Sequence, residues 1–250
     1  MIKRILLILD GSPQMPAAVG YTLNLARDLG SEILLYPLAT KRASGSAAMV
    51  GEEWIGPVIR NAEKEGIELQ VLSAAAASFK ESLEWATSCD LTVLPPAIPD
   101  DVIRSERRLV LLLTAGGSAV MLPCTNQRSS RTVAIAWDGS VACARALKLH
   151  LQLFHRPHLH YLLLHIGGEP EAAEALLDRG GALIRAHGAS VETLARSGKP
   201  AERLLEITAS LKPDHLLLAP HWRRLLDKKR LGRTSRKMLQ AGTVSLFMAV

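Results

Sequence analysis

The stretch RILLILDGSP, residues 4–13, decides the fold, because its pattern returns as RTVAIAWDGSV at residues 131–141. Each copy is an apolar run that ends in Asp-Gly-Ser and leads into a helical pattern. Asp138 follows Asp10 by 128 residues (138 − 10), which defines an internal repeat. The 250-residue chain is therefore predicted to contain two copies of one structural unit.

A polar stretch separates the copies. CTNQRSS, residues 124–130, has neither helical nor strand periodicity and is typical of a linker. We therefore predict two domains, residues 1–123 and residues 131–250.

In both copies apolar strands alternate with amphipathic helices, which indicates right-handed crossovers and a parallel sheet covered on both faces. The predicted fold class is α/β, with two tandem five-stranded parallel-sheet sandwich domains. In the first copy Ser12 is placed to cap the first helix, and Gly30 and Gly66 are placed to end helices. The strands are expected at residues 4–9, 32–38, 67–73, 91–96 and 118–123, and the helices at about 17–29, 51–65 and 78–88, with a shortened fourth helix.

The second copy is expected to repeat this order. Its strands are predicted at residues 132–137, 158–166, 190–195, 215–220 and 244–250. Helices are predicted at residues 142–154, 170–188 and 200–211, and a basic helix is predicted before the last strand.

Composition excludes several classes of protein. The hydrophobic content of 48% suffices for ordinary cores, and no apolar run approaches the roughly 20 residues of a membrane-spanning helix. The three cysteines are widely spaced without a CxxC pair, which argues against a disulfide framework or a zinc site. We expect a cytoplasmic protein without membrane contact. The net charge of +6 weakly favours anionic partners.

Three features together resemble the universal stress protein family in its tandem form: the strand that ends in Asp-Gly-Ser, the segment GKPAERLLEIT at residues 198–208, and a strand followed by a basic segment, glycine and Ser/Thr. The resemblance implies a five-stranded α/β sandwich. It also implies that the last strands of the two halves pair about a pseudo-two-fold axis, as an intramolecular pseudo-dimer, and that a homodimer is a further option. ATP-binding members place an acidic residue after the first strand. They hold the phosphates with glycine, two residues, glycine, nine residues, then glycine and Ser/Thr.

In the second half this motif is degenerate. If Gly232 is the last glycine, Trp222 and Ala219 stand at the other two glycine positions. Pro220 has no N–H to offer a phosphate, and the Trp222 side chain would fill the cradle. We therefore expect ATP to bind weakly or not at all, and a simple phosphate or sulfate to bind at the start of the following helix. The candidate nucleotide or anion site comprises Asp138, Gly232, Arg233, Thr234 and Ser235.

The first half has lost the motif more completely. Pro95 and Pro96 occupy the turn where the first glycine belongs, and Asp100 and Asp101 would repel a phosphate from the next helix. Asp10 is interpreted as a turn residue after a buried strand rather than a ligand contact.

Other motifs are weaker. LHIGGEP, residues 164–170, is interpreted as a glycine-rich turn rather than a nucleotidyl-transfer signature. His158 and His160 share one face of a strand, but no acidic or cysteine neighbour supports them, so no metal site is predicted. No arrangement of residues indicates catalysis, and we expect a protein that is not an enzyme.

The segment from Arg223 to Lys237 holds eight basic residues and one acid, a net charge of +7 (8 − 1). Such a run is usually a solvated helix face, but here it flanks a predicted helix start that favours anions.

Three functions stay open. The first is a non-enzymatic tandem universal stress protein in stress response, which senses a ligand or contacts unidentified proteins. The second is an ATP-binding or slowly hydrolysing member with a rearranged pocket in the second half. The third is a nucleic-acid-associated protein that uses residues 223–237, a function that the 4% aromatic content makes less favourable.

Overall fold

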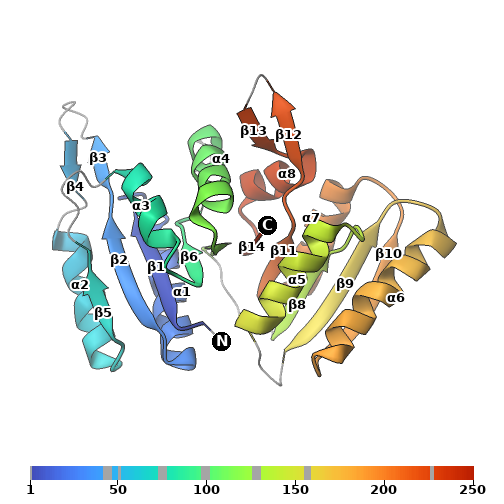
Figure 1. Cartoon of the computed structure of the whole chain (residues 1–250), viewed down its shortest axis with the longest axis horizontal. Coiled ribbons are helices and arrows are strands. Elements are labelled where there is room, and N and C mark those ends of the chain that lie inside the picture. The colour runs from blue at the N-terminus through green and yellow to red at the C-terminus, as the bar shows by residue number, and fades with distance from the viewer. Residues whose placement is uncertain are drawn as a thin grey trace. The chain divides into compact units, whose positions relative to one another are not determined.

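The computed structural model describes residues 2–41, 47–49, 52–72, 78–96, 102–125, 131–154, 159–225 and 228–250. The chain divides into two compact units, residues 1–125 and 126–250 (Figure 1). Each unit contains five parallel strands with helices packed against them, so the predicted α/β fold is confirmed. Within the described residues, no helix combines the length and apolarity needed to cross a bilayer.

Unit 1 has the sheet order β7-β6-β1-β2-β5. A short antiparallel pair, β3 and β4, was not predicted. The predicted shortened fourth helix is wrong, because α4 continues through a π-helical turn, Leu112–Gly116. The elements are β1 (Arg4–Leu9), α1 (Met15–Leu29), β2 (Glu32–Pro37), β3 (Ala39–Lys41), β4 (Ala47–Met49), α2 (Glu52–Lys64), β5 (Leu69–Val71), α3 (Phe79–Ala86), β6 (Leu91–Val93), α4 (Val102–Leu111) and β7 (Ala119–Leu122).

Unit 2 has the sheet order β10-β9-β8-β11-β14, in which equivalent strands are neighbours as in unit 1. Its elements are β8 (Thr132–Ala136), α5 (Val141–Leu153), β9 (His160–Ile166), α6 (Pro170–Ala186), β10 (Ser190–Arg196), α7 (Pro200–Leu211), β11 (His215–Leu218), β12 (Trp222–Leu225), β13 (Lys228–Leu231), α8 (Arg233–Ala241) and β14 (Leu246–Met248). The basic segment was expected to be a helix, but most of it forms the antiparallel ribbon β12–β13. Only residues from Arg233 onward are helical.

The inner strands form the cores. All of β11 is buried, as are five of the six residues of β1, whereas the edge strands β5 and β10 are half-buried or exposed. Continuous apolar runs therefore mark strands covered on both faces. On the β10 edge, Glu192 and Arg196 are exposed, and such charges discourage pairing with other chains.

The serines of the two Asp-Gly-Ser turns differ in whether they cap the helix that follows. Ser140 caps α5, because its Oγ accepts a hydrogen bond from the N–H of Cys143 at 3.1 Å. The predicted cap by Ser12 is wrong: a turn intervenes, Gln14 is the N-cap of α1, and the Ser12 Oγ has no hydrogen-bond partner. Pro16, the second residue of α1, has no N–H for the side chain of the N-cap residue Gln14 to bind. Gly30 and Gly66 adopt left-handed φ angles of 65° and 67°, as their positions at helix ends predicted.

A histidine pair lies inside unit 2. His150 of α5 and His215 of β11 are buried, and their Nε2 atoms are 2.6 Å apart. The Tyr161 hydroxyl lies 3.3 Å from His150 Nδ1, and the rings of Phe154 and Phe247 pack against His150. Burial lowers the pKa of both imidazoles, that of His215 to about 4, and His215 lowers that of His150 further. Both rings are therefore neutral in the fold at pH 7, with one Nε2–H donating to the other Nε2.

Candidate functional site

Unit 2 has a cavity of about 280 Å³ at the carboxyl ends of its strands. In parallel α/β sheets this is the end where ligands bind. The carboxyl ends of β8, β9 and β11, with the residues that follow β8 and β11, form one side, and the starts of α7 and α8 complete it. The lining residues are Ala136, Trp137, Asp138, Leu164, His165, Ile166, Pro200, Leu204, Leu218, Ala219, His221, Thr234 and Ser235.

The cavity brings together three of the five predicted site residues: Asp138, Thr234 and Ser235. Gly232 and Arg233 are not part of its lining. The Gly232 N–H donates to the His221 carbonyl at 2.7 Å, and a Cβ on Gly232 would lie 3.2 Å from that oxygen. Gly232 is therefore needed where two backbone segments approach closely, and its N–H is not available for a phosphate.

The start of α8 keeps other donors. The N–H groups of Arg233, Thr234 and Ser235 belong to the first turn, which has no acceptors within the helix, and the first hydrogen bond of α8 runs from Arg236 N–H to the Gly232 carbonyl. Gly232 caps the helix without a side chain. Among the described residues no acceptor meets these three N–H groups, so the turn presents them and the positive end of the helix dipole beside the cavity.

Asp138 is held in place from two sides. Its Oδ1 accepts a hydrogen bond from the Ser140 N–H at 2.9 Å, and its Oδ2 contacts His221 Nε2. Burial alone would raise the pKa of the carboxyl, but the hydrogen bonds from Ser140 and His221 outweigh it, and the pKa lies below its ordinary value. Asp138 is therefore a carboxylate at neutral pH, able to accept hydrogen bonds from a ligand.

His221 is the contact that sequence reasoning missed. It lies 83 residues from Asp138 in the chain, in the short connection between β11 and β12. Its side chain is 67% exposed, whereas that of Asp138 is 37% exposed. Because both groups reach solvent, their attraction is modest and a ligand can replace the imidazole.

The remaining walls are fixed by hydrogen bonds. The Trp137 indole donates from Nε1 to the Leu176 carbonyl at 2.8 Å, and His165 Nδ1 lies 2.8 Å from the Trp137 carbonyl. Leu164, Leu204 and Leu218 supply apolar surface. The cavity thus combines apolar side chains with a few polar groups, the usual character of a small-molecule site.

The comparisons with known proteins bear on this unit first. Residues 129–249 match a family model described as the universal stress protein family. No curated protein matches the chain in a sequence search.

Solved structures of universal stress proteins share the fold. A universal stress protein from Archaeoglobus fulgidus is similar with a TM-score of 0.74 and 16% identity, over 98% of this chain and 95% of that one. A Pseudomonas aeruginosa protein provisionally assigned to the same family gives a TM-score of 0.68 and 13% identity, over 99% and 93% of the two chains. A functionally unknown protein from Pseudomonas aeruginosa gives a TM-score of 0.65 and 14% identity, over 99% of this chain and 92% of that one. At these identities the likeness concerns the fold.

Unit 1 lies outside the universal stress protein match, and its equivalent position is closed. Asp10 Oδ1 accepts from the Ser12 N–H at 3.0 Å, which agrees with its interpretation as a turn residue. Its Oδ2 pairs with Arg108 at 3.0 Å, with side chains 9% and 15% exposed, and Arg108 also lies over the Phe79 ring. Sequence reasoning missed this pair. Pro95 and Pro96 follow β6 as expected, while residues 99–101 lie outside the described residues.

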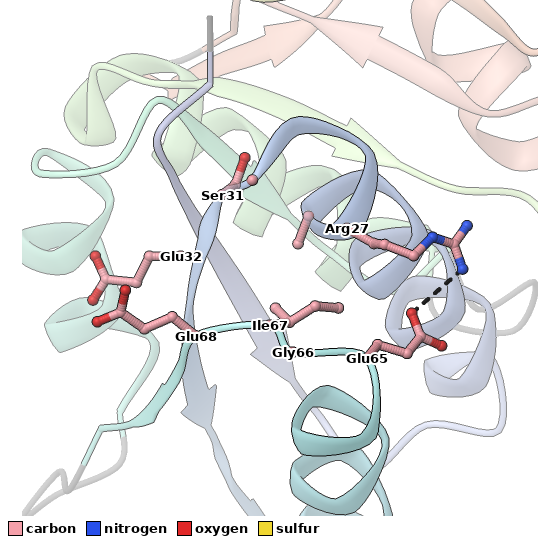
Figure 2. A pocket seen from close by; sticks show the side chains of 9 residues that line it. Arg27, Ser31, Glu32, Glu65, Gly66, Ile67 and Glu68 are labelled. Atoms are coloured by element: carbon pink, nitrogen blue, oxygen red, sulfur yellow. Dashed lines mark hydrogen bonds and ion pairs between the residues drawn. The ribbon is translucent and has the colours of Figure 1, made fainter.

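A second cavity, of about 250 Å³, lies in unit 1 at the amino ends of β2 and β5 (Figure 2). Glu32, Glu65 and Glu68 line it together with Arg27. Glu32 already pairs with Arg4 at 2.8 Å, and Glu65 pairs with Arg27 at 3.4 Å, the dashed contact in Figure 2. Because it lies at the end of the sheet opposite to that used for ligands, we place the candidate site in unit 2.

His160, one of the two histidines considered as metal ligands, makes other contacts. His160 Nδ1 lies 3.2 Å from the Ser190 hydroxyl, and its Nε2 lies 3.7 Å from Glu192. His158 lies outside the described residues. Within the part of the chain that the structure describes, no three His, Cys, Asp or Glu side chains gather as a metal site would require.

Proposed function

We propose that this chain is a tandem universal stress protein that senses a small ligand in the cavity of unit 2 and catalyses no reaction. The cavity with Asp138 in its lining is the observation that carries the proposal. The tandem form is supported by the shared strand order of the two units and by an Asp-Gly-Ser turn after the first strand of each. Unit 1 has a structural role, because its acidic residue, Asp10, already forms an ion pair with Arg108.

The size of the cavity favours a ligand of nucleoside size over a nucleoside triphosphate. Its volume of about 280 Å³ is at the small end for ligand pockets, which span roughly 300 to 1,000 Å³. Asp138 would accept hydrogen bonds from ligand hydroxyls once His221 leaves it, and the first turn of α8 would receive a single anionic group. The ribbon β12–β13 replaces the glycine loop that would hold a triphosphate.

The absence of catalysis is part of the proposal. Among the described residues, no hydroxyl or thiol group is hydrogen-bonded to His221, so its contact with Asp138 activates no nucleophile. The alternative is an ATP-hydrolysing protein that uses the same pocket. Release of phosphate from Mg-ATP that is lost in Asp138→Asn would establish that alternative and contradict the proposal.

The direct test is calorimetry with adenosine, AMP and Mg-ATP. We expect Mg-ATP to bind no tighter than about 10 µM, weaker than the −8.2 kcal/mol that corresponds to 1 µM. Adenosine or AMP should bind more tightly, and their binding should shift the amide signals of Thr234 and Ser235. If none of the three moves those amides, unit 2 does not sense such a ligand and the proposal is wrong.

Substitutions of Asp138 and His221 separate the roles of these two residues. Asp138→Asn should weaken binding roughly tenfold or more, because a hydrogen bond to a charged group is worth about 1.5–3 kcal/mol. His221→Ala should strengthen binding by up to about fivefold, because it removes a competing contact to Asp138 that is worth at most about 1 kcal/mol.

Matched controls are available in the same unit. Asp178→Asn changes an exposed carboxylate on α6, and His160→Ala changes the histidine at the opposite end of β9. Both should leave the affinity unchanged. Weaker binding in His221→Ala would show that His221 contacts the ligand rather than competing with it.

A further inference from the structure

His165, in the lining of the cavity of unit 2, has an imidazole tautomer that is fixed by its neighbour. It is the last residue but one of β9. Its Nδ1 lies 2.8 Å from the Trp137 carbonyl oxygen, which can only accept a hydrogen bond, so Nδ1 carries the proton. A neutral imidazole has one N–H group, and the Nε2 of His165 is therefore a hydrogen-bond acceptor.

This Nε2 atom has no donor within the protein. Among the described residues, the side chain of His165 forms its hydrogen bond to the Trp137 carbonyl, and none reaches Nε2. Gly168, which follows β9, leaves Nε2 uncovered: a Cβ at this glycine would lie 3.7 Å from Nε2, and its φ of 78° is one that other residues rarely adopt. A half-buried acceptor in a cavity lining is satisfied by water until a ligand donor replaces that water.

The sheet order places His165 on the side of β8 away from β11. The strands β9, β8 and β11 are neighbours in that order, and His165, Asp138 and His221 lie at or just beyond their carboxyl ends. Adjacent strands are about 4.8 Å apart, so the ends of β9 and β11 are separated by roughly 10 Å. The start of α8 is tied to the β11 side, because the Gly232 N–H donates to the His221 carbonyl. A nucleoside with its anionic group at α8 and its hydroxyls at Asp138 therefore directs its base towards His165.

We propose that His165 determines which bases the cavity accepts, because its Nε2 takes a hydrogen bond from an amino group of the base. This inference rests on the nucleoside-sized ligand proposed above and adds the base specificity of the same cavity. An amino group on the base supplies the donor that Nε2 lacks, whereas an oxo group would place two acceptors against each other. A base with neither group would bind without this hydrogen bond.

The test is calorimetry on the full chain with adenosine and with purine riboside, which is adenosine without its amino group. It is run at pH 8, where histidine side chains are ordinarily neutral. The parent chain should bind adenosine about two- to twelvefold more tightly, the range that one uncharged hydrogen bond supplies. In His165→Asn this preference should disappear, because the Asn amide can still donate to the Trp137 carbonyl but ends short of the Nε2 position. The affinity of this variant for purine riboside should equal that of the parent.

The matched control is His187→Asn. The Nδ1 of His187 lies 2.9 Å from the Leu183 carbonyl, an equivalent arrangement, but His187 is at the end of α6 and outside the cavity lining. This control should keep the preference for adenosine. Equal binding of the two ligands by the parent chain, or an unchanged preference in His165→Asn, would overturn the role of His165 and leave the proposed function standing. If neither ligand binds and AMP leaves the amides of Thr234 and Ser235 unmoved, the function itself is wrong and this inference falls with it.

One measurement checks the tautomer without any variant. The imidazole nitrogen NMR signals of His165 in the ligand-free chain should show the proton on Nδ1, and adenosine should shift the Nε2 signal more than purine riboside does. A proton on Nε2 in the ligand-free chain would overturn the proposal, even if His165→Asn failed to fold.

Discussion

Lowering the pH from 7 toward 4 should progressively destabilise unit 2 through His150 and His215. Both imidazoles are neutral and buried in the fold, whereas an unfolded histidine takes up a proton near pH 6.5. The unfolded state therefore binds more protons, and the free energy of unfolding falls as the pH drops below about 6.5. The contribution of His215 to this loss ends near pH 4, where the folded His215 is itself protonated. For His215 alone the loss of unfolding free energy is about 3 kcal/mol, because a pKa difference of one corresponds to about 1.36 kcal/mol.

Urea unfolding across this pH range gives the measurement, with hydrogen exchange to separate the units. Amides of β11 and β14 should lose protection before those of β1 and β6, because all eight histidines lie in the second half of the sequence. The control is His150→Leu/His215→Leu/Tyr161→Phe, which removes the polar partners together and leaves none unsatisfied. Its stability should be nearly flat between pH 6.5 and 4. A parent protein that is equally flat would contradict the prediction.

Arg108→Ala should cost unit 1 about 3 kcal/mol or more of unfolding free energy, because it leaves the Asp10 carboxylate largely buried without its ion pair. The lost contact with the Phe79 ring adds to the effect. Chemical denaturation monitored by hydrogen exchange in β1 and β6 measures the change. The double variant Asp10→Asn/Arg108→Met should recover most of it, since no uncompensated charge stays buried.

The equivalent substitution in unit 2 provides the comparison. His221→Ala should change stability by less than about 1 kcal/mol, because the pair with Asp138 is largely exposed to solvent. Equal costs in the two units would show that the acidic residues are held alike. The expected difference fits a closed position in unit 1 and an accessible one in unit 2.

Much of the fold was predictable from local patterns. Continuous apolar runs located the inner strands such as β1 and β11, since strands covered on both faces need no polar alternation. The repeat of Asp-Gly-Ser placed Asp10 and Asp138 at equivalent strand ends, and the glycine positions identified the helix ends at Gly30 and Gly66. The ribbon was not predictable, because the basic segment has no apolar periodicity that distinguishes a strand from a solvated helix.

The sequence by itself determined the repeated α/β unit, the carboxylate after the first strand of each copy and the loss of the phosphate-binding glycines. Only the tertiary structure decided which side chain meets each carboxylate. Arg108 lies 98 residues from Asp10, and His221 lies 83 residues from Asp138. These contacts depend on β6 lying beside β1 and β11 beside β8, which brings each following segment over the neighbouring strand end. A buried arginine therefore closes one position, whereas an exposed histidine leaves the other open to a ligand.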